Sequence, residues 1–317
     1  MIGYIGKRLA MCVVVVLLLM IFLAVIVHLI PGDPVRTILG PRASESLSET
    51  VREEMGLDDP VPVQVYDFVK GAVQGDLGSD FVSHLAVTEL IGEVLPHTLI
   101  LAAAGLGLAA LIGIPLGIFA STRPNSMGDR MAGIISISLI TVPGYVAGLF
   151  LLLIFSVELG WLPAIGTGDF SDPVDYLKHL ALPAIALSLA WIGYLARLVR
   201  TSMFEVLNQN YIRTAQAFGL HDRRIYYKYA LKNAIIPTVA VLGVGLGTLM
   251  GGAVFVEIIF NRAGIGTLIL DSIQNRNFPI VRGSVLVIAV LFVVANLLAD
   301  LSYRLLDPRV RAERSAA

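Results

Sequence analysis

Residues 233–260 read NAIIPTVAVLGVGLGTLMGGAVFVEIIF, and Glu257 carries the one charge among them. An α-helix rises 1.5 Å per residue and the hydrocarbon core of a bilayer is about 30 Å thick, so about 20 mostly apolar residues cross it. The stretch is longer than that, and we interpret it as a helix that spans a membrane.

Five other stretches meet the same criterion. They run over Leu9–Ile30, His97–Ala120, Met131–Val157, Leu180–Leu198 and Gly283–Leu306. The composition agrees, because 56% of the 317 residues are hydrophobic and 15% are charged, whereas about 25% of an ordinary soluble domain is charged. We therefore predict an all-α membrane protein with six transmembrane helices.

The spans divide the chain into four regions. We expect the N-terminal tail and first span in 1–30, a small helical extracytoplasmic subdomain in 31–96, a five-helix core in 97–306 and a tail in 307–317. No small-x-small cleavage site precedes Pro31, so we interpret the first span as a retained signal anchor.

The distribution of positive charge predicts the orientation. With the N-terminus in the cytoplasm, the inner segments hold 15 Lys and Arg and the outer segments hold 8. Loops that stay in the cytoplasm carry an excess of these residues. We therefore expect both termini in the cytoplasm, with an even number of membrane crossings between them.

The region 31–96 is too long for a simple connection. Ser46 and Glu49 have the spacing of a capping box that opens a short helix, and Val63–Val73 reads as a second, amphipathic helix followed by a turn at Gly75–Gly78. The subdomain has two interpretations: a cap over the helices, or a docking face for an outer partner.

Small residues recur every four positions in two spans. Such stripes let helix backbones approach closely in lipid, so we expect packing faces there rather than substrate sites. Pro115, Pro143 and Pro183 permit kinks in or beside spans. The predicted packing positions are Gly113, Gly117, Gly243, Gly247 and Gly251.

Two acidic residues, Glu257 and Asp300, fall within predicted spans, where a charge costs about 3 kcal/mol or more and usually faces the protein interior. Glu257 has two interpretations. It lines a substrate path as part of an outer gate, or it pairs with a nearby base such as Arg262 or lies at the level of the lipid headgroups.

The loop 200–232 between the fourth and fifth spans combines aromatic and basic residues. Tyr211–Phe218 reads as a short helix, and Gly219 is a typical residue just after a helix end. A polar turn and a second basic helix follow. A simple connector does not need aromatic side chains beside Arg and Lys, whereas protein interfaces are enriched in both.

At these residues the chain resembles the inner-membrane permeases of binding-protein-dependent ABC importers, of the dipeptide, oligopeptide and nickel type. The loop motif of that family is Glu-Ala-Ala, three residues, then Gly. Arg213-Thr214-Ala215 and Gly219 occupy its positions here, while the usual Ile-x-Leu-Pro that follows is replaced. Further matches run in order along the chain: His28–Pro34, Gly40–Ala43, Gly56–Gln64, Gly75–Gly78, Val256–Phe260, Gly264–Gly266 and Leu305–Arg309.

The resemblance implies a type I ABC importer permease fold, a location in the bacterial inner membrane and a set of partners. These are a second, homologous permease, two ATPase subunits that bind ATP and Mg²⁺, an extracytoplasmic solute-binding protein and the lipid bilayer, with no nucleic acid. The family's coupling helix, which docks on the ATPase, falls on Tyr211–Gly219. We expect Arg213 to supply hydrogen bonds, Ala215 to permit close approach, and Tyr211 and Phe218 to be apolar anchors; Thr214 completes the motif.

Several other functions are disfavoured by the sequence. There is no Gly-x-x-x-x-Gly-Lys-Ser/Thr motif, so we expect ATP hydrolysis only in the partner subunits. The five histidines have no ligand spacing and Cys12 stands alone, so we expect no cofactor or metal bound by this chain. A stand-alone secondary carrier would favour inverted repeats and buried ion ligands, and an intramembrane enzyme would place catalytic residues at one depth.

The substrate is the least determined part of the prediction. Short peptides are the first choice, and nickel chelates, glutathione-like peptides and oligosaccharides are alternatives within the family. Because the spans carry few charges, we expect the binding protein rather than this chain to hold the selectivity.

Overall fold

The computed structural model describes residues 2–29, 59–81 and 83–306, together with the single positions 45, 49 and 52. Within the described part the regular elements are helices, and Ser79 and Ala86 form an isolated β-bridge. The expected capping box at Ser46 and Glu49 lies largely outside the described residues. The chain divides into two compact units. The first comprises residues 1–98 with 263–293, and the second comprises residues 99–262 with 294–317.

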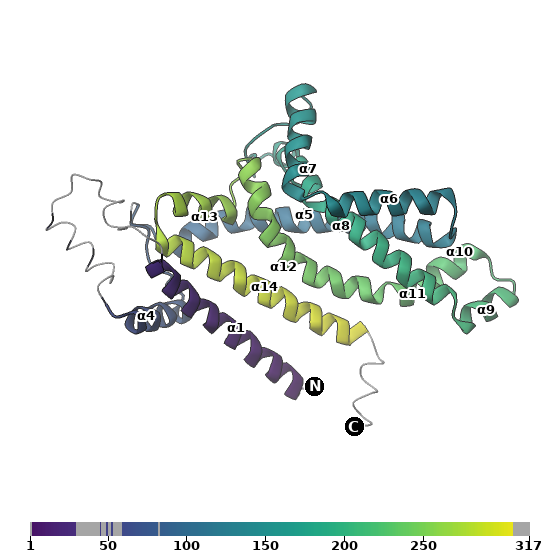
Figure 1. The fold of residues 1–317 in the computed structure, drawn as a ribbon, viewed down its shortest axis with the longest axis horizontal. Coiled ribbons are helices and arrows are strands. Elements are labelled where there is room, and N and C mark those ends of the chain that lie inside the picture. Colours follow the sequence, from purple (N-terminus) through teal and green to yellow (C-terminus); the bar gives the residue numbers. More distant parts are fainter. Residues whose placement is uncertain are drawn as a thin grey trace. The chain divides into compact units, whose positions relative to one another are not determined.

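Among the described residues, five helices are long and apolar enough to cross a membrane, and the number of spans is six if one bent pair of helices counts as a single span. They are α1 (Ile2–Leu29), α5 (Val87–Thr122), α8 (Pro173–Leu207), α12 (Ile236–Ile259) and α14 (Phe278–Leu306) (Figure 1). Each overlaps a predicted span; α5, α8 and α14 contain theirs in full, whereas α12 is shorter than the predicted 233–260. Helices α5 and α8 extend beyond the apolar stretches, because hydropathy marks the lipid-facing length and not where the helix ends.

The predicted third span differs from a simple helix. Met131–Val157 divides into α6 (Met127–Thr141) and α7 (Gly144–Leu151), which continues as the π-helical segment η1 (Leu152–Glu158). The two parts bend by 98°, and Figure 1 shows α7 turning away from α6 and α8. Pro143 explains the bend, since its ring has no N–H to donate and keeps Val142 out of the helical region, at ψ 118°.

The first unit contains α1, α4 (Val61–Gln74), α13 (Ile265–Gln274) and the adjoining parts of α5 and α14. Helix α4 is the amphipathic helix expected over Val63–Val73, and it ends in a left-handed Gly75. Helix α13 was not predicted, because its ten residues are too few for a span. Its start is fixed by the Ile265 N–H, which donates to Thr98 Oγ1 at 2.9 Å.

The second unit packs α6, α7 and α12 against α8. Close approach depends on residues without a Cβ: one added to Gly117 would lie 2.6 Å from the Ala196 carbonyl oxygen, and one added to Gly113 would lie 2.8 Å from the Ile192 oxygen. Gly243 lies against Ala299 of α14 in the same way. Gly247 is buried, whereas nothing lies within 4 Å of a Cβ built on Gly251.

Candidate functional site

The connector between α8 and α12 folds into four short helical pieces. These are α9 (Asn210–Ala217), α10 (Asp222–Arg224), the π-helical η2 (Ile225–Ala230) and α11 (Leu231–Ala234). The connector therefore has the helix–turn–helix form expected from the sequence, with the turn at 218–221.

Helix α9 ends in a Schellman motif. Gly219 takes φ +71°, its N–H donates to the Gln216 oxygen at 2.9 Å, and the Leu220 N–H donates to the Ala215 oxygen at 3.3 Å. Leu220 then packs on the buried cluster described next, which is the apolar contact that accompanies this motif. A residue with a Cβ is disfavoured at a positive φ, so the backbone explains the glycine here.

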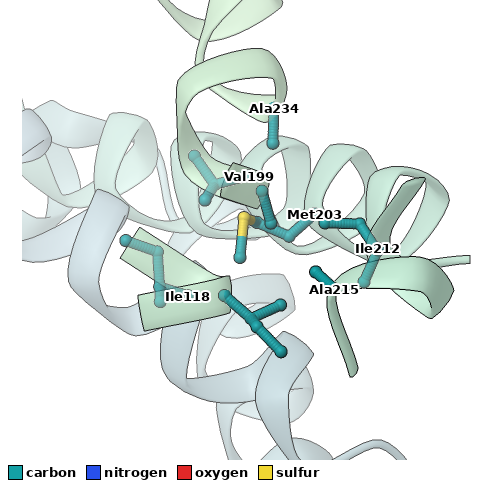
Figure 2. Close-up of a cluster of buried hydrophobic side chains, with 8 residues drawn as sticks. Ile118, Val199, Met203, Ile212, Ala215 and Ala234 are labelled. Atoms are coloured by element: carbon teal, nitrogen blue, oxygen red, sulfur yellow. The ribbon is translucent and has the colours of Figure 1, made fainter. Parts of the chain in front are cut away.

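A buried apolar cluster fixes the inner side of α9. Figure 2 shows Ile212 and Ala215 of α9 directed at Val199 and Met203 of α8 and at Ile118 of α5. Each of these side chains is at most 7% exposed. The cluster is completed by Ile225, Ala230 and Ala234 of the following segments. Ala215, which we expected to let a partner approach, therefore lies on the inward side, where it lets α9 approach its own chain.

The outer side of α9 is exposed and carries the remaining predicted residues. Phe218 is 82% exposed, and Tyr211, Arg213 and Thr214 are also exposed. Tyr211 is held in place, because its hydroxyl accepts a hydrogen bond from Asn233 Nδ2 at 2.9 Å. One face of α9 is thus anchored in the chain and the other is open.

The surroundings of α9 add further exposed aromatic and basic side chains. Tyr227 and Phe204 are exposed, and Arg223, Arg224 and Lys228 lie on the same connector. The partly buried Tyr226 hydroxyl has a raised pKa, chiefly because burial disfavours its charged form and also because Asp222 is near. The connector is therefore an apolar and basic surface.

An ion pair that we did not predict ties this end of α8 to the start of α6. The Arg200 guanidinium donates to both carboxylate oxygens of Asp129, at 2.5 and 2.8 Å. Asp129 also accepts the Asn125 N–H at 2.9 Å and is nearly buried. Residues 71 positions apart give no local signal in one sequence. The sequence feature that could have drawn attention to Asp129 is the Ser126 cap, which starts α6 and places Asp129 in the first turn of that helix.

Glu257 lies at the opposite end of α12 and is fully buried, as is Arg262. The Arg262 N–H donates to the Glu257 carbonyl at 2.9 Å, and its guanidinium donates to the Thr167 oxygen at 3.0 Å and to the Tyr176 hydroxyl at 2.7 Å. Burial lowers the pKa of Arg262, while Tyr176 and Glu257 act in the opposite direction. The arrangement brings together the two residues of the pairing interpretation; the outer-gate role of Glu257 stays a prediction.

No group of three potential metal-ligating side chains occurs among the residues described.

Two family models match the chain. One, described as the inner membrane component of binding-protein-dependent transport systems, matches residues 113–312, and the model for the N-terminal part of such components matches residues 1–102.

Relatives of known name match over nearly the whole length. The chain is 36% identical over 311 residues to the glutathione transport system permease protein GsiC of Shigella flexneri, covering 98% of this chain and 99% of the relative. It is 37% identical over 318 residues to a putative peptide permease protein of Brucella ovis, with the same coverage. A chain of the inward-facing MetNI methionine ABC transporter aligns with TM-score 0.58 at 17% identity, over 69% of this chain and 96% of that one, which shows a shared fold.

Proposed function

The chain belongs to the inner-membrane permeases of binding-protein-dependent ABC importers, and from that premise we propose that it forms half of a pathway that imports short peptides. Membership makes the chain the membrane subunit of the transporter and not its ATPase, and it removes the stand-alone carrier as an alternative. A second permease, homologous to this one, supplies the other half of the pathway in the proposal. Two ATPase subunits bind ATP and Mg²⁺, and this chain binds no cofactor of its own.

The observation that carries the proposal is the two-sided α9. Its inner side is packed against α5 and α8 through Ile212, so a displacement of α9 displaces those helices with it. Its outer side presents Phe218 and Arg213, an apolar anchor and a charge-assisted hydrogen-bond donor. A helix with these two sides suits docking on an ATPase.

Transport then proceeds by alternating access. ATP binds more tightly to the closed ATPase pair than to the open pair, and this difference in affinity shifts the transporter between its inward-open and outward-open states. Docked α9 helices carry the ATPase movement into the membrane as rigid-body displacement. In this scheme α9 and both termini lie on the cytoplasmic side, which the 15 Lys and Arg of the predicted inner segments, against 8 in the outer ones, support.

The names of the relatives support a proposal for the substrate class. One carries a name for glutathione transport and another for peptide transport, so we propose short peptides, glutathione-like peptides among them. Nickel chelates and oligosaccharides are the alternatives within the family. The outer binding protein selects among them, and exchanging that protein is expected to change the transported substrate.

Two experiments test the proposal. The tagged chain, extracted from native cells in mild detergent, is expected to bring down a second permease and two ATPases; recovery without any ATPase would contradict it. Uptake of labelled glutathione, dipeptides and oligopeptides is then measured in cells that lack the chain and in cells that regain it. Restored uptake of nickel or sugars without peptides would overturn the substrate class.

A further inference from the structure

An apolar recess of about 490 Å³ lies in the second unit, where α6 and α12 both pack against α8 (Figure 1). None of the side chains that line it carries a charge. Its volume falls in the range of about 300–1,000 Å³ that is typical of small-ligand pockets. The side chains that form most of its wall are Ile140 of α6, Trp191 and Tyr194 of α8, and Val241 and Val244 of α12.

The recess is open to the surroundings of the unit. Ile140, Tyr194 and Val244 are each more than a third exposed. The rings of Trp191 and Tyr194 pack edge to face, with centroids 5.7 Å apart. Tryptophan and tyrosine are enriched at the depth of the lipid headgroups, where the ring lies in apolar material and the polar atom reaches water. The recess therefore has an apolar interior and an aromatic rim.

Two contacts fix the level of α6 against α8 beside the recess. The Arg200 guanidinium donates to Asp129 at 2.8 Å near the connector. Two turns earlier on α8, a Cβ built on Gly193 would lie 3.0 Å from Ile140 Cγ1. The two helices therefore run antiparallel, and the end of the recess nearer the connector lies beside the ion pair.

Two further arginines stand at this end of the recess. Arg197 follows Tyr194 by one turn of α8 and precedes Arg200 by one turn, while Arg130 adjoins Asp129. On α6, residues 140, 137, 133 and 130 succeed each other at spacings of three and four, so Arg130 belongs to the side of that helix that lines the recess. The Arg200–Asp129 pair thus brings Arg130 and Arg197 to one level.

Both of these arginines are exposed cations without a counter-charge in the described part of the chain. No acceptor among the described residues contacts either guanidinium group. The one carboxylate at their level, Asp129, is held by Arg200 through both of its oxygens. Glu205 lies two turns beyond Arg197 on α8. Two like charges side by side at the end of an apolar recess favour an anionic ligand.

The chemistry of the site selects an amphiphile. A guanidinium group binds phosphate through two parallel hydrogen bonds, and the recess accepts a hydrocarbon chain. Arg197 is also the last residue but one of the predicted span Leu180–Leu198, which places it at the depth of the headgroups. Basic pockets between membrane helices on the cytoplasmic side bind anionic lipid headgroups.

A transported peptide fits the same site less well. Its amine carries a positive charge that needs an acidic partner, whereas the lining of the recess has no acid and Asp129 is engaged by Arg200. A lipid with a net negative headgroup needs no such partner.

We propose that an anionic glycerophospholipid of the inner leaflet binds here, with its phosphate between Arg130 and Arg197 and one acyl chain in the recess. The inference rests on the proposed function, which places the connector end of α8 in the inner leaflet. It adds a lipid ligand that joins α6 to α8 beside the ion pair under the connector.

Photolabelling of the complete transporter tests the inference. The transporter is reconstituted in nanodiscs of phosphatidylcholine that contain a trace of phosphatidylglycerol with a diazirine at the end of one acyl chain. After illumination, mass spectrometry of the peptides is expected to find adducts around Trp191 and Val244. The same diazirine on phosphatidylcholine should label these peptides about tenfold less, because it lacks the net charge that the two arginines recognise. Equal labelling by the two lipids would overturn the inference.

Matched substitutions separate headgroup recognition from general contact with lipid. Arg197→Gln and Arg130→Gln each remove one exposed cation and are each expected to lower labelling by phosphatidylglycerol about tenfold. Lys178→Gln is the control, because it removes an exposed cation from the opposite end of α8, and it should leave labelling unchanged. Loss of labelling that is no greater with Arg197→Gln than with Lys178→Gln would contradict the site.

Two more measurements probe the recess itself. Ala240→Leu narrows it without changing a charge, and it should lower labelling by phosphatidylglycerol at Trp191 while thermal unfolding of the transporter stays the same. Unchanged labelling would mean that the acyl chain lies elsewhere. A diazirine-bearing dipeptide that labels the recess and displaces phosphatidylglycerol during transport would assign the site to the substrate and overturn the lipid.

The two proposals fail in different ways. Recovery of the ATPases with the tagged chain reports on the proposed function, and the preference for phosphatidylglycerol reports on the recess. Recovered ATPases together with equal labelling by the two lipids would remove the lipid site and leave the importer standing. Absence of ATPases from the unsubstituted chain would remove the importer, whatever the labelling shows.

Discussion

Replacing Phe218 by alanine tests α9 as the docking helix most directly, because this side chain supports little within its own chain. Truncating a buried Phe costs about 3–5 kcal/mol, but Phe218 is 82% exposed. Only about a fifth of that loss applies, so we expect the free energy of unfolding to fall by under about 1 kcal/mol. An aromatic anchor at the centre of an interface contributes about 2–4 kcal/mol, so Phe218→Ala should weaken ATPase binding about 30- to 1,000-fold.

The assay compares two quantities on one preparation. The permease is purified into lipid nanodiscs, its Kd for the ATPase is measured by titration, and its thermal unfolding is followed separately. Tyr66→Ala is the matched control, because Tyr66 is a 65% exposed aromatic on α4, outside the connector. If Phe218→Ala binds the ATPase within about threefold of the unchanged chain, or loses no more affinity than Tyr66→Ala, α9 does not dock through Phe218.

Four further substitutions address α9 and the support beneath it. Ile212→Ala removes a fully buried side chain and should cost about 2–5 kcal/mol, which faster hydrogen exchange across 208–235 would reveal; unchanged exchange would mean that the cluster does not hold α9. Gly219→Pro fixes φ near −65° where the chain needs +71°. Both Gly219→Pro and Arg213→Glu should uncouple ATP hydrolysis from transport, or block assembly of the transporter, while insertion of the chain into the membrane continues. Asp129→Ala leaves a partly exposed Arg200 without its bidentate carboxylate and should lower stability by about 1–3 kcal/mol, with normal thermal unfolding as the contrary result.

Much of this fold could be predicted because lipid imposes a simple rule on sequence. A span must be long and apolar, so α1, α5, α8, α12 and α14 stand out without any knowledge of their contacts. The end of α9 was equally predictable, since Gly219 meets a local backbone requirement, a positive φ.

The features that escaped prediction depend on residues distant in sequence or on a choice that local rules leave open. Hydropathy could not show whether Pro143 would kink its helix slightly or turn it by 98°. Both outcomes occur in this chain, since Pro183 lies inside a helix that continues past it. The contacts of Arg200 with Asp129 and of Arg262 with Tyr176 join segments 71 and 86 residues apart. The inward direction of Ala215 also depends on contacts with distant segments, so the loop motif, which gives only the residue type, could not predict it.

The contacts around the connector predict that it moves as a single body with three spans. The buried cluster joins α9, η2 and α11 to α5 and α8, and the Arg200–Asp129 pair adds α6. Close-packed interiors shift as units instead of deforming continuously, so ATPase closure should displace these elements together. Spin labels at the exposed Met127 of α6 and Gln216 of α9, in a Cys12→Ser background, should keep one distance distribution with and without ATP in the complete transporter. The distance between the Gln216 label and a label on the docking helix of the second permease should change in the same experiment. A nucleotide-dependent distance between Met127 and Gln216 would mean that α9 bends at its base, and the displacement would then be absorbed before it reached the membrane.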